Sequence, residues 1–455
     1  MRYAPPGLCL NDFDLLRVGD EWRLLHLQAP PVHPFDAALL ETSYGQASSR
    51  DLVSWTPLAP AFGIGPPGSF DDSAVWTMHR VPTEGGTAMF YTGVTRDPDG
   101  GARQAVGLAL AGRDGEGGWR RANGGRPVVT ADPAWYRTDT AMAWRDPFVV
   151  RDTARGRWLM LVCARTRDEP LGRSGCVGTA TSTDLHHWET GPPLLAPGDI
   201  DELECPVLEP VEDGWLLLGS IGPDHEIRSW HAPDLTGPWS PQGRLGPAGA
   251  YAPRLTTAGG DRLLVHTLER RHGLRDDGPL GRGVIAQPKV LRHTPGSPPE
   301  LCWWSGLDAH LGAPSPAAAQ HEPAPSPDGC LEATLTGPTP RLQLRVRDGG
   351  DAAVEIALAD GVLTAAYPGG PELARTAVPR APRRSLRVLT VAEYLEVYLD
   401  DVFVLACCAY RPSGSGARLT VDGRPHPLVR RPLGEPAARD DVSAVHRPLA
   451  TAPIR

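Results

Sequence analysis

The sequence predicts an all-β protein made of a five-bladed β-propeller followed by a C-terminal β-sandwich. Three observations lead to this prediction. The apolar segments are short, end at Gly, Pro or Asp, and show no sustained helical period. A motif recurs about every 60 residues through the first two thirds of the chain. Beyond it, apolar and polar residues alternate with a period of two, as in antiparallel strands.

Composition limits the possible partners and location. A chain of 455 residues is too long for one ordinary core, so we expect two domains. The net charge of −9 disfavours nucleic acid or an anionic membrane as a partner. The segment 1–7 lacks the apolar region of a secretory signal, and no apolar run is long enough to span a bilayer. The eight cysteines have no metal-binding spacing. We therefore expect a cytoplasmic protein with reduced thiols. We also expect it to be a monomer or a homodimer.

The repeat defines the first domain. Its clearest copies, residues 45–55 and 177–188, combine a strand of small residues, an Asp-Leu turn and a closing tryptophan. Weaker copies end at Trp119 and Trp239, and an eroded copy extends from 283 to Trp304. The closing tryptophans lie 51 to 69 residues apart, which fits four-stranded propeller blades with long loops. A large sandwich would not explain the repeated turn and tryptophan. We assign residues 1–307 to a five-bladed catalytic propeller.

The remaining chain divides into three parts. Residues 308–328 are rich in Pro, Ala and Ser and read as a linker. Residues 329–425 alternate with a period of two, interrupted by tight turns such as Asp360-Gly361, and predict a β-sandwich. Residues 426–455 form a C-terminal tail to which the sequence assigns no fold.

Three acids stand where strands of different blades begin. Asp12 opens the first unit, Asp146 the third and Glu204 the fourth. The innermost strands of a propeller line its central channel, so these side chains should meet at one mouth. Pro147 supports this placement because proline suits the first residue of a strand better than its middle. Cleavage of a glycosidic bond needs two such carboxyl groups. Glu204 also lies among Asp201, Glu202 and Glu209. Their negative charges would favour the protonated form of Glu204, which could then donate a proton.

The motifs around these acids resemble those of glycoside hydrolase family 32, which contains invertases, inulinases, levanases and related fructosyltransferases. The resemblance lies in Asn11-Asp12, Arg145-Asp146-Pro147 and Glu204-Cys205-Pro206, in that order and at that spacing. Gln28 and the segments 50–55 and 70–74 also match family motifs. The resemblance extends to about residue 425 and implies the same propeller and sandwich.

The resemblance also implies site roles and an activity. Asp12 would be the nucleophile, Glu204 the general acid and then the base, and Asp146 a ligand of sugar hydroxyls. The implied substrate-binding residues are Asn11, Gln28, Tyr44, Phe70, Asp71 and Arg145. Such an enzyme would remove terminal β-fructofuranosyl units from sucrose-like or fructan-like saccharides by a retaining double displacement, without metal or cofactor. The expected partner is therefore an oligosaccharide or small glycoside.

Departures from the family pattern leave the exact substrate open. Phe13-Asp14-Leu15 replaces the family's Pro-Asn-Gly, and Tyr44 stands where the family has tryptophan. Asp71 and Asp72 replace small residues at what would be the pocket rim, and Asp71 could bind a hydroxyl or a cation, or face solvent. Trp76 and Trp135 could stack on a sugar ring or belong to the core.

Three alternative functions remain open at this stage. A fructosyltransferase would use the same residues and differ only in the acceptor that competes with water. An arabinose- or xylose-specific furanosidase on a related five-bladed propeller would invert configuration instead. A carbohydrate-binding propeller without turnover is the third alternative, although three intact acids argue against it.

Overall fold

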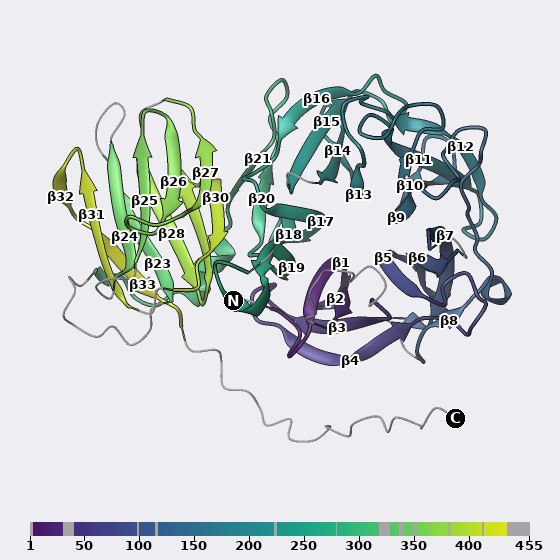
Figure 1. Ribbon diagram of the computed structural model, residues 1–455, viewed down its shortest axis with the longest axis horizontal. Coiled ribbons are helices and arrows are strands. Elements are labelled where there is room, and N and C mark those ends of the chain that lie inside the picture. Colours follow the sequence, from purple (N-terminus) through teal and green to yellow (C-terminus); the bar gives the residue numbers. More distant parts are fainter. Residues whose placement is uncertain are drawn as a thin grey trace.

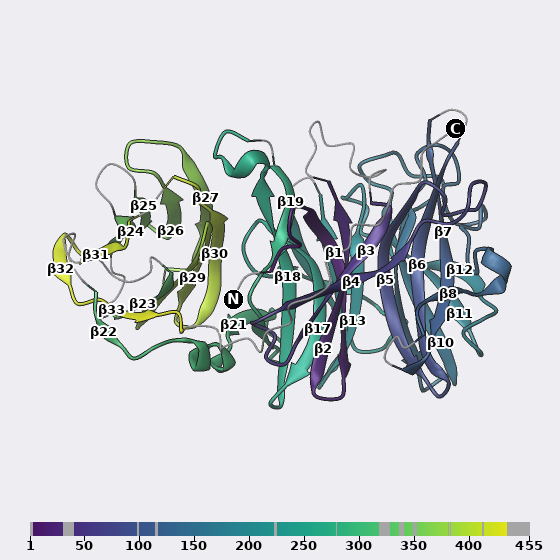
Figure 2. The same cartoon turned by 90° about the horizontal axis from the view of Figure 1, so that it is seen from below.

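The structure is a computed structural model of the 455-residue chain. It describes residues 3–30, 41–97, 100–113, 117–222, 225–278, 280–317, 328–335, 341–348, 353–380, 382, 384–411 and 414–434. Five blades surround a central axis, and two further layers of strands pack face to face beside them (Figures 1 and 2). The first and last blades and one of these layers are hydrogen-bonded into one 15-stranded sheet. The predicted fold class, a five-bladed propeller followed by a sandwich, is confirmed. No described helix is long and apolar enough to cross a membrane.

Each blade is an antiparallel sheet whose strands follow chain order from the central axis outward (Figure 1). Blades I and II contain β1 (Cys9–Val18), β2 (Glu21–Ala29), β3 (Ser43–Ser49) and β4 (Thr56–Gly63), then β5 (Ala74–Thr83), β6 (Gly86–Arg96), β7 (Ala102–Ala111) and β8 (Arg120–Arg121). Blade III contains β9 (Trp144–Asp152), β10 (Arg157–Arg165), β11 (Gly175–Ser182) and β12 (Glu189–Leu195). Blade IV contains β13 (Glu204–Val211), β14 (Gly214–Ile221), β15 (Glu226–Ala232) and β16 (Ser240–Arg244). Blade V contains β17 (Ala250–Ala258), β18 (Asp261–Arg271), a third strand divided into β19 (Leu280–Ile285) and β20 (Lys289–Arg292), and β21 (Glu300–Trp303).

The sandwich has two antiparallel sheets enclosing their own apolar core. One sheet, in spatial order, contains β22 (Ser315–Pro316), β33 (Val429–Pro432), β23 (Gly329–Thr334), β28 (Ser385–Val391), β29 (Tyr394–Leu399) and β30 (Val402–Cys408). The other contains β27 (Glu372–Ala377), β26 (Val362–Ala366), β25 (Val354–Ala359), β24 (Leu342–Asp348), β31 (Gly416–Val421) and β32 (Arg424–His426). Three short 3₁₀ helices complete the described elements: η3 (Asn123–Gly125), η4 (His272–Leu274) and η5 (Ser305–His310).

The sequence repeat corresponds to the outer half of each blade. The small-residue strand is the third strand, and the Asp-Leu turn joins it to the fourth. In blade III, Asp184 Oδ1 accepts the backbone N–H groups of His186 and His187, both at 2.8 Å. Leu185 adopts a left-handed conformation with φ of 69°, as Leu52 does in blade I with φ of 62°. An aspartate that caps its own turn offsets the cost of this conformation.

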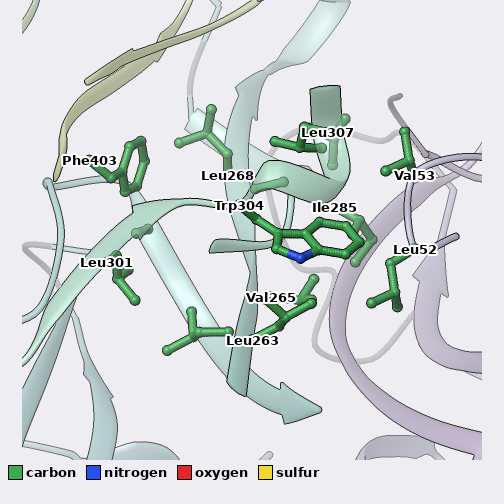
Figure 3. Close-up of a cluster of buried hydrophobic side chains, with 14 of the residues drawn as sticks. Leu52, Val53, Leu263, Val265, Leu268, Ile285, Leu301, Trp304, Leu307 and Phe403 are labelled. Atoms are coloured by element: carbon green, nitrogen blue, oxygen red, sulfur yellow. The ribbon is translucent and has the colours of Figure 1, made fainter. Parts of the chain in front are cut away.

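The fifth tryptophan departs from the repeat. Trp55, Trp119, Trp188 and Trp239 each stand immediately before the fourth strand of their blade, whereas Trp304 follows the fourth strand of blade V. Trp304 instead packs against Leu52 and Val53 of blade I and against Ile285 and Leu307 (Figure 3). It therefore helps to close the ring between the first and last blades. Backbone pairing closes the same junction, Tyr3 with Ile285 and Leu10 with Gly283.

The domain boundaries differ in detail from those expected. Ser315–Pro316, within the expected linker, pairs with β33 as the edge of a sandwich sheet. β33 itself, Val429–Pro432, lies beyond the expected sandwich end at residue 425 and pairs with β23. Residues 308–310 of the expected linker belong to η5, and Leu311 pairs with Leu433. Residues 318–327 and the tail from 435 onward lie outside the described residues.

Candidate active site

The innermost strands share an irregularity at the mouth of the channel. Each of β1, β5, β9, β13 and β17 has a β-bulge near its start, where the pairing with the second strand shifts register. A bulge bends a strand and redirects its side chains. The bulged positions are Asn11-Asp12, Thr77, Asp146-Pro147, Cys205-Pro206 and Ala252-Pro253. Repetition of one bulge in all five blades directs five sets of side chains into one space.

Three of these bulges contain a strained residue before a proline. Asp146, Cys205 and Ala252 have φ of 61°, 48° and 50°. A residue without glycine's freedom held in such a conformation costs on the order of 1–3 kcal/mol. Neighbouring groups accept each N–H that the bulge removes from the ladder: Thr92 Oγ1 from Asp146 at 2.9 Å, Asp146 Oδ2 from Cys205 at 3.0 Å, and Ser220 Oγ from Ala252 at 2.8 Å.

These bulges surround a pocket of about 290 Å³ at the channel mouth. Five residues predicted from the sequence line it: Asn11, Asp12, Arg145, Asp146 and Glu204. Trp76, for which the sequence left stacking or core packing open, also lines it. The other described lining residues are Leu27, Glu41, Thr77, Gln104 and Tyr251.

Asp12 has one carboxylate oxygen held and one available. Thr77 Oγ1 donates to Asp12 Oδ2 at 2.5 Å. Oδ1 is buried and has no hydrogen-bond partner among the described residues. Asp12 thus lines the pocket with a carboxylate whose orientation Thr77 fixes, as a nucleophile requires.

Glu204 is held from two sides. Arg145 Nη2 donates to its Oε1, and the Tyr251 hydroxyl donates to its Oε2. Arg145 also binds Glu202 through both terminal nitrogens, at 2.9 and 2.7 Å, which fixes the plane of the guanidinium. The Glu204 side chain is 25% exposed, so it is the acid of the three that solvent reaches most easily.

The acids near Glu204 are not the unpaired charges that the sequence suggested. Glu202 binds Arg145 as described, Arg165 lies 2.6 Å from Asp201, and Arg262 lies 2.7 Å from Glu209. Each of these negative charges therefore has a positive partner.

Asp146 occupies the most enclosed position of the three. It is 2% exposed, and burial raises its pKa to about 7, an effect that the negative charges of Asp12 and Glu204 reinforce. Its Oδ2 accepts the Cys205 N–H and lies 3.8 Å from Arg145 Nε. The side chain is thus fixed to the neighbouring blade while it lines the pocket.

Four residues predicted to bind substrate are not among the described residues that line the pocket. Gln28 donates to Ser43 Oγ at 3.0 Å. Tyr44 is fully buried and donates to the backbone oxygen of Trp76 at 2.5 Å, so it supports a lining residue from behind. Phe70 packs against the Tyr91 ring at 5.9 Å.

Asp71 is the fourth of these residues, and its surroundings argue against a ligand. It is fully buried, binds Arg121 at 2.7 Å and accepts from the Tyr91 hydroxyl at 2.9 Å. The carboxylate is therefore committed to an internal ion pair rather than placed at the pocket rim. Trp135, the other tryptophan left open, is 44% exposed and is not among the described lining residues.

Tyr251 is the main residue that sequence reasoning missed. The segment Tyr251-Ala252-Pro253 repeats in blade V the arrangement of Arg145-Asp146-Pro147 and Glu204-Cys205-Pro206: a pocket residue, a left-handed residue and a proline. This repeat of X-Pro at the start of an innermost strand was a usable signal. Gln104 had no such signal, because it reaches the site from β7, the third strand of blade II. Its Oε1 accepts the Trp144 N–H at 2.9 Å.

Comparison with known proteins gives a consistent assignment. The sequence model of the glycosyl hydrolases family 32 N-terminal domain matches residues 3–230. A sucrose-6-phosphate hydrolase of Klebsiella pneumoniae is 30% identical over 184 residues, which cover 38% of this chain and 35% of that protein. A levanase of Bacillus sp. (strain L7) is 29% identical over 226 residues, which cover 44% of this chain and 22% of that protein. The matched region thus spans about a third or less of these two relatives.

A structural likeness extends further along the chain. The structure of sucrose-6-phosphate hydrolase from Lactobacillus gasseri superposes with a TM-score of 0.72 and 16% identity, and the match covers 93% of this chain and 91% of that one. At 16% identity, this structural similarity establishes the fold alone.

Proposed function

The chain belongs to glycosyl hydrolase family 32, and we propose that it is a retaining glycoside hydrolase that releases terminal β-fructofuranosyl units from sucrose-like or fructan-like saccharides. One observation carries the proposal: Asp12, Asp146 and Glu204, from three different blades, line one pocket. The family membership supports the sugar class and the roles of the three acids, and the hydrogen bonds that orient Asp12 and Glu204 support those roles.

The first half-reaction uses Asp12 and Glu204. Asp12 Oδ1, the oxygen not bound by Thr77, attacks the anomeric carbon of the fructosyl unit. Glu204 gives its proton to the glycosidic oxygen, and the C–O bond to the leaving sugar breaks. The product is a fructosyl ester of Asp12 and a free leaving sugar.

The second half-reaction reverses these roles. Glu204, now a carboxylate, takes a proton from water, and the water oxygen attacks the anomeric carbon and releases Asp12. Asp146 accepts hydrogen bonds from fructosyl hydroxyls, and these strengthen as positive charge develops on the ring. Arg145 and Tyr251 hold Glu204 in place through both steps.

The charge of the pocket favours a neutral substrate. Four described lining residues are acidic (Asp12, Glu41, Asp146 and Glu204), and Arg145 is the basic one. Arg145 is already committed to Glu202 and Glu204. A phosphate group would meet negative charge in this pocket without a free cation among these residues. We therefore propose sucrose or a short fructan, rather than a sugar phosphate, as the preferred substrate.

Product analysis with variants tests the proposal. Wild-type protein should release fructose from sucrose or short fructans with retention, and faster than from sucrose 6-phosphate. Glu204→Gln with fructosyl fluoride should accumulate protein heavier by one fructosyl unit, and Asp12→Asn should not. Glu372→Gln, an exposed acid paired with Arg375 in the sandwich, serves as control and should behave as wild type.

Other outcomes would favour the alternatives. Release of arabinose or xylose with inversion would indicate the related furanosidase, and dominant oligosaccharide synthesis from sucrose would indicate a transferase. Unchanged turnover in Asp12→Asn would contradict the nucleophile assignment.

A further inference from the structure

We propose that Asp213, His231 and His293 form a binding site for one divalent transition-metal ion, with Zn²⁺ as the best fit, that joins blades IV and V. Asp213 lies in the turn between β13 and β14, His231 lies in β15, and His293 follows β20. β13 begins with Glu204 at the pocket and ends at Val211. The cluster therefore lies at the opposite end of the blade from the catalytic acids.

Three ligand atoms already converge. Asp213 Oδ1 lies 2.7 Å from His293 Nε2 and 3.2 Å from His231 Nε2. The ligand atoms of the cluster lie within 4.8 Å of one another. The two imidazole rings face each other with centroids 5.8 Å apart and planes 21° apart. Bonds of about 2.0–2.2 Å to a tetrahedral Zn²⁺ place its ligands roughly 3.3 Å apart, so small side-chain movements would admit the ion.

Hydrogen bonding alone does not satisfy this cluster. His293 Nε2 donates to Asp213 Oδ1 at 2.7 Å, whereas His231 Nε2, 3.2 Å from the same oxygen, is buried and makes no aligned hydrogen bond among the described residues. His293, with a side chain 6% exposed, also has a buried Nδ1 without a partner there. Buried polar atoms are normally paired. An ion between the three side chains would give His231 Nε2 a directed bond in place of this unaligned contact.

The donor set indicates the class of ion. Two imidazoles and one carboxylate suit Zn²⁺ and its neighbours Co²⁺ and Ni²⁺, whereas Ca²⁺ and Mg²⁺ prefer oxygen ligands only. The fourth position would be open to water, because the Asp213 and His231 side chains are 29% and 20% exposed.

Such an ion would act as a cross-link. Asp213 and His231 belong to blade IV, and His293 belongs to blade V, so coordination would tie two adjacent sheets. The ligands are 18 and 62 residues apart and match no short metal motif, which is why the sequence gave no indication of the site.

Metal loading of the whole protein tests this site. Purified protein, stripped with chelator and dialysed against a low concentration of Zn²⁺, should retain one equivalent by elemental analysis. Its melting temperature should rise with Zn²⁺. Co²⁺ should give visible bands without a thiolate charge-transfer band, because no cysteine takes part.

Matched variants make the test specific. His231→Ala and His293→Ala should each lose the equivalent of Zn²⁺ and the thermal shift. His187→Ala should keep both, because His187 pairs with Asp184 at 2.7 Å without a second imidazole in the cluster. Hydrolysis of sucrose should be the same with and without Zn²⁺. Absence of bound metal in the wild type, or equal retention in the two cluster variants when circular dichroism shows them folded, would overturn the proposal.

Discussion

At the scale of single residues, Asp146 shows a conflict between stability and function. A carboxyl group with 2% exposure beside two other acids is held where its charge is costly. The proposed role requires that location, because a sugar hydroxyl is bound most strongly where water is excluded. Because burial raises the pKa of Asp146, the cost can be measured as a dependence of stability on pH.

Asp146→Asn should remove a pH-dependent penalty. The folded pKa of about 7 lies above the unfolded value of 3.8. Between these values the native state holds a proton that the unfolded chain has lost, so wild-type stability falls as pH rises through this window. From pH 5 to pH 8 this contribution should amount to about 2–3 kcal/mol. In urea unfolding, the variant should gain stability relative to wild type as pH rises, while its turnover falls by about a hundredfold or more.

Asparagine is a suitable replacement because it tolerates the left-handed conformation and can still accept the Cys205 N–H. Parallel pH profiles for wild type and variant would contradict the proposed cost of Asp146. Glu189→Gln, an exposed acid in the same blade, is the control for general effects of charge removal.

At the scale of elements, the bulge on each innermost strand is the feature that builds the site. In blade III, β9 places Asp146 at the pocket, and a hydroxyl of the adjacent blade II accepts the Asp146 N–H that the bulge displaces. Thr92 Oγ1 performs this role and also donates to the Thr77 oxygen at 3.2 Å. Thr77 in turn holds Asp12. One buried threonine thus connects two of the three catalytic strands.

Thr92→Val should therefore disturb the site without changing the volume of the core. The Asp146 N–H would lose its acceptor, at a cost of about 1–3 kcal/mol in unfolding free energy. Turnover should fall more than substrate affinity, because the reacting groups shift while the sugar contacts remain. The measurements are urea unfolding and steady-state kinetics.

Thr92→Ser should restore most of the loss, since it keeps the hydroxyl. Thr87→Val on the same strand should have little effect on turnover, because Thr87 is buried but has no side-chain hydrogen bond in the described part of the chain. Equal kinetic effects at positions 87 and 92 would show that core packing, rather than the Asp146 contact, is responsible.

The sequence was sufficient to predict the strands and turns, but not the contacts between side chains of different blades. Short strands, the Asp-Leu turn and X-Pro positions are local signals, so they predicted the blades and placed Asp12, Asp146 and Glu204 at strand starts. Partners from other blades, such as Thr92 and Gln104, depend on how sheets meet in space. The same limit explains Asp71, which looked like a rim residue but meets Arg121 from a different strand.

At the scale of the whole molecule, one sheet of 15 strands continues from blades I and V into one layer of the sandwich. β21 of blade V pairs with β30 of the sandwich, and the Trp303 N–H donates to the Asp401 oxygen at 2.8 Å (Figure 1). This continuity favours a supporting role for the sandwich, whereas cytoplasmic location and the choice between monomer and homodimer stay predictions.

The junction also contains a fully buried ion pair. Lys289, the single lysine of the chain, binds Glu396 of the sandwich, and neither side chain is exposed. Lys289 Nζ donates to the Gln287 oxygen at 2.8 Å and lies 4.3 Å from the centre of the Phe403 ring, while the Tyr398 hydroxyl donates to Glu396 at 2.5 Å. Burial lowers the pKa of Lys289 and raises that of Glu396, so each charge depends on the other.

Removing one partner should therefore destabilise the junction far more than removing both. Lys289→Met leaves Glu396 buried and unpaired, which should cost about 3–5 kcal/mol in urea unfolding. Lys289→Met combined with Glu396→Leu replaces the pair by apolar groups and should recover most of that loss. The double-mutant cycle measures the coupling directly. A loss below about 1 kcal/mol in the single variant, or equal losses in the single and double variants, would show that strand pairing and apolar packing alone hold the sandwich against the propeller.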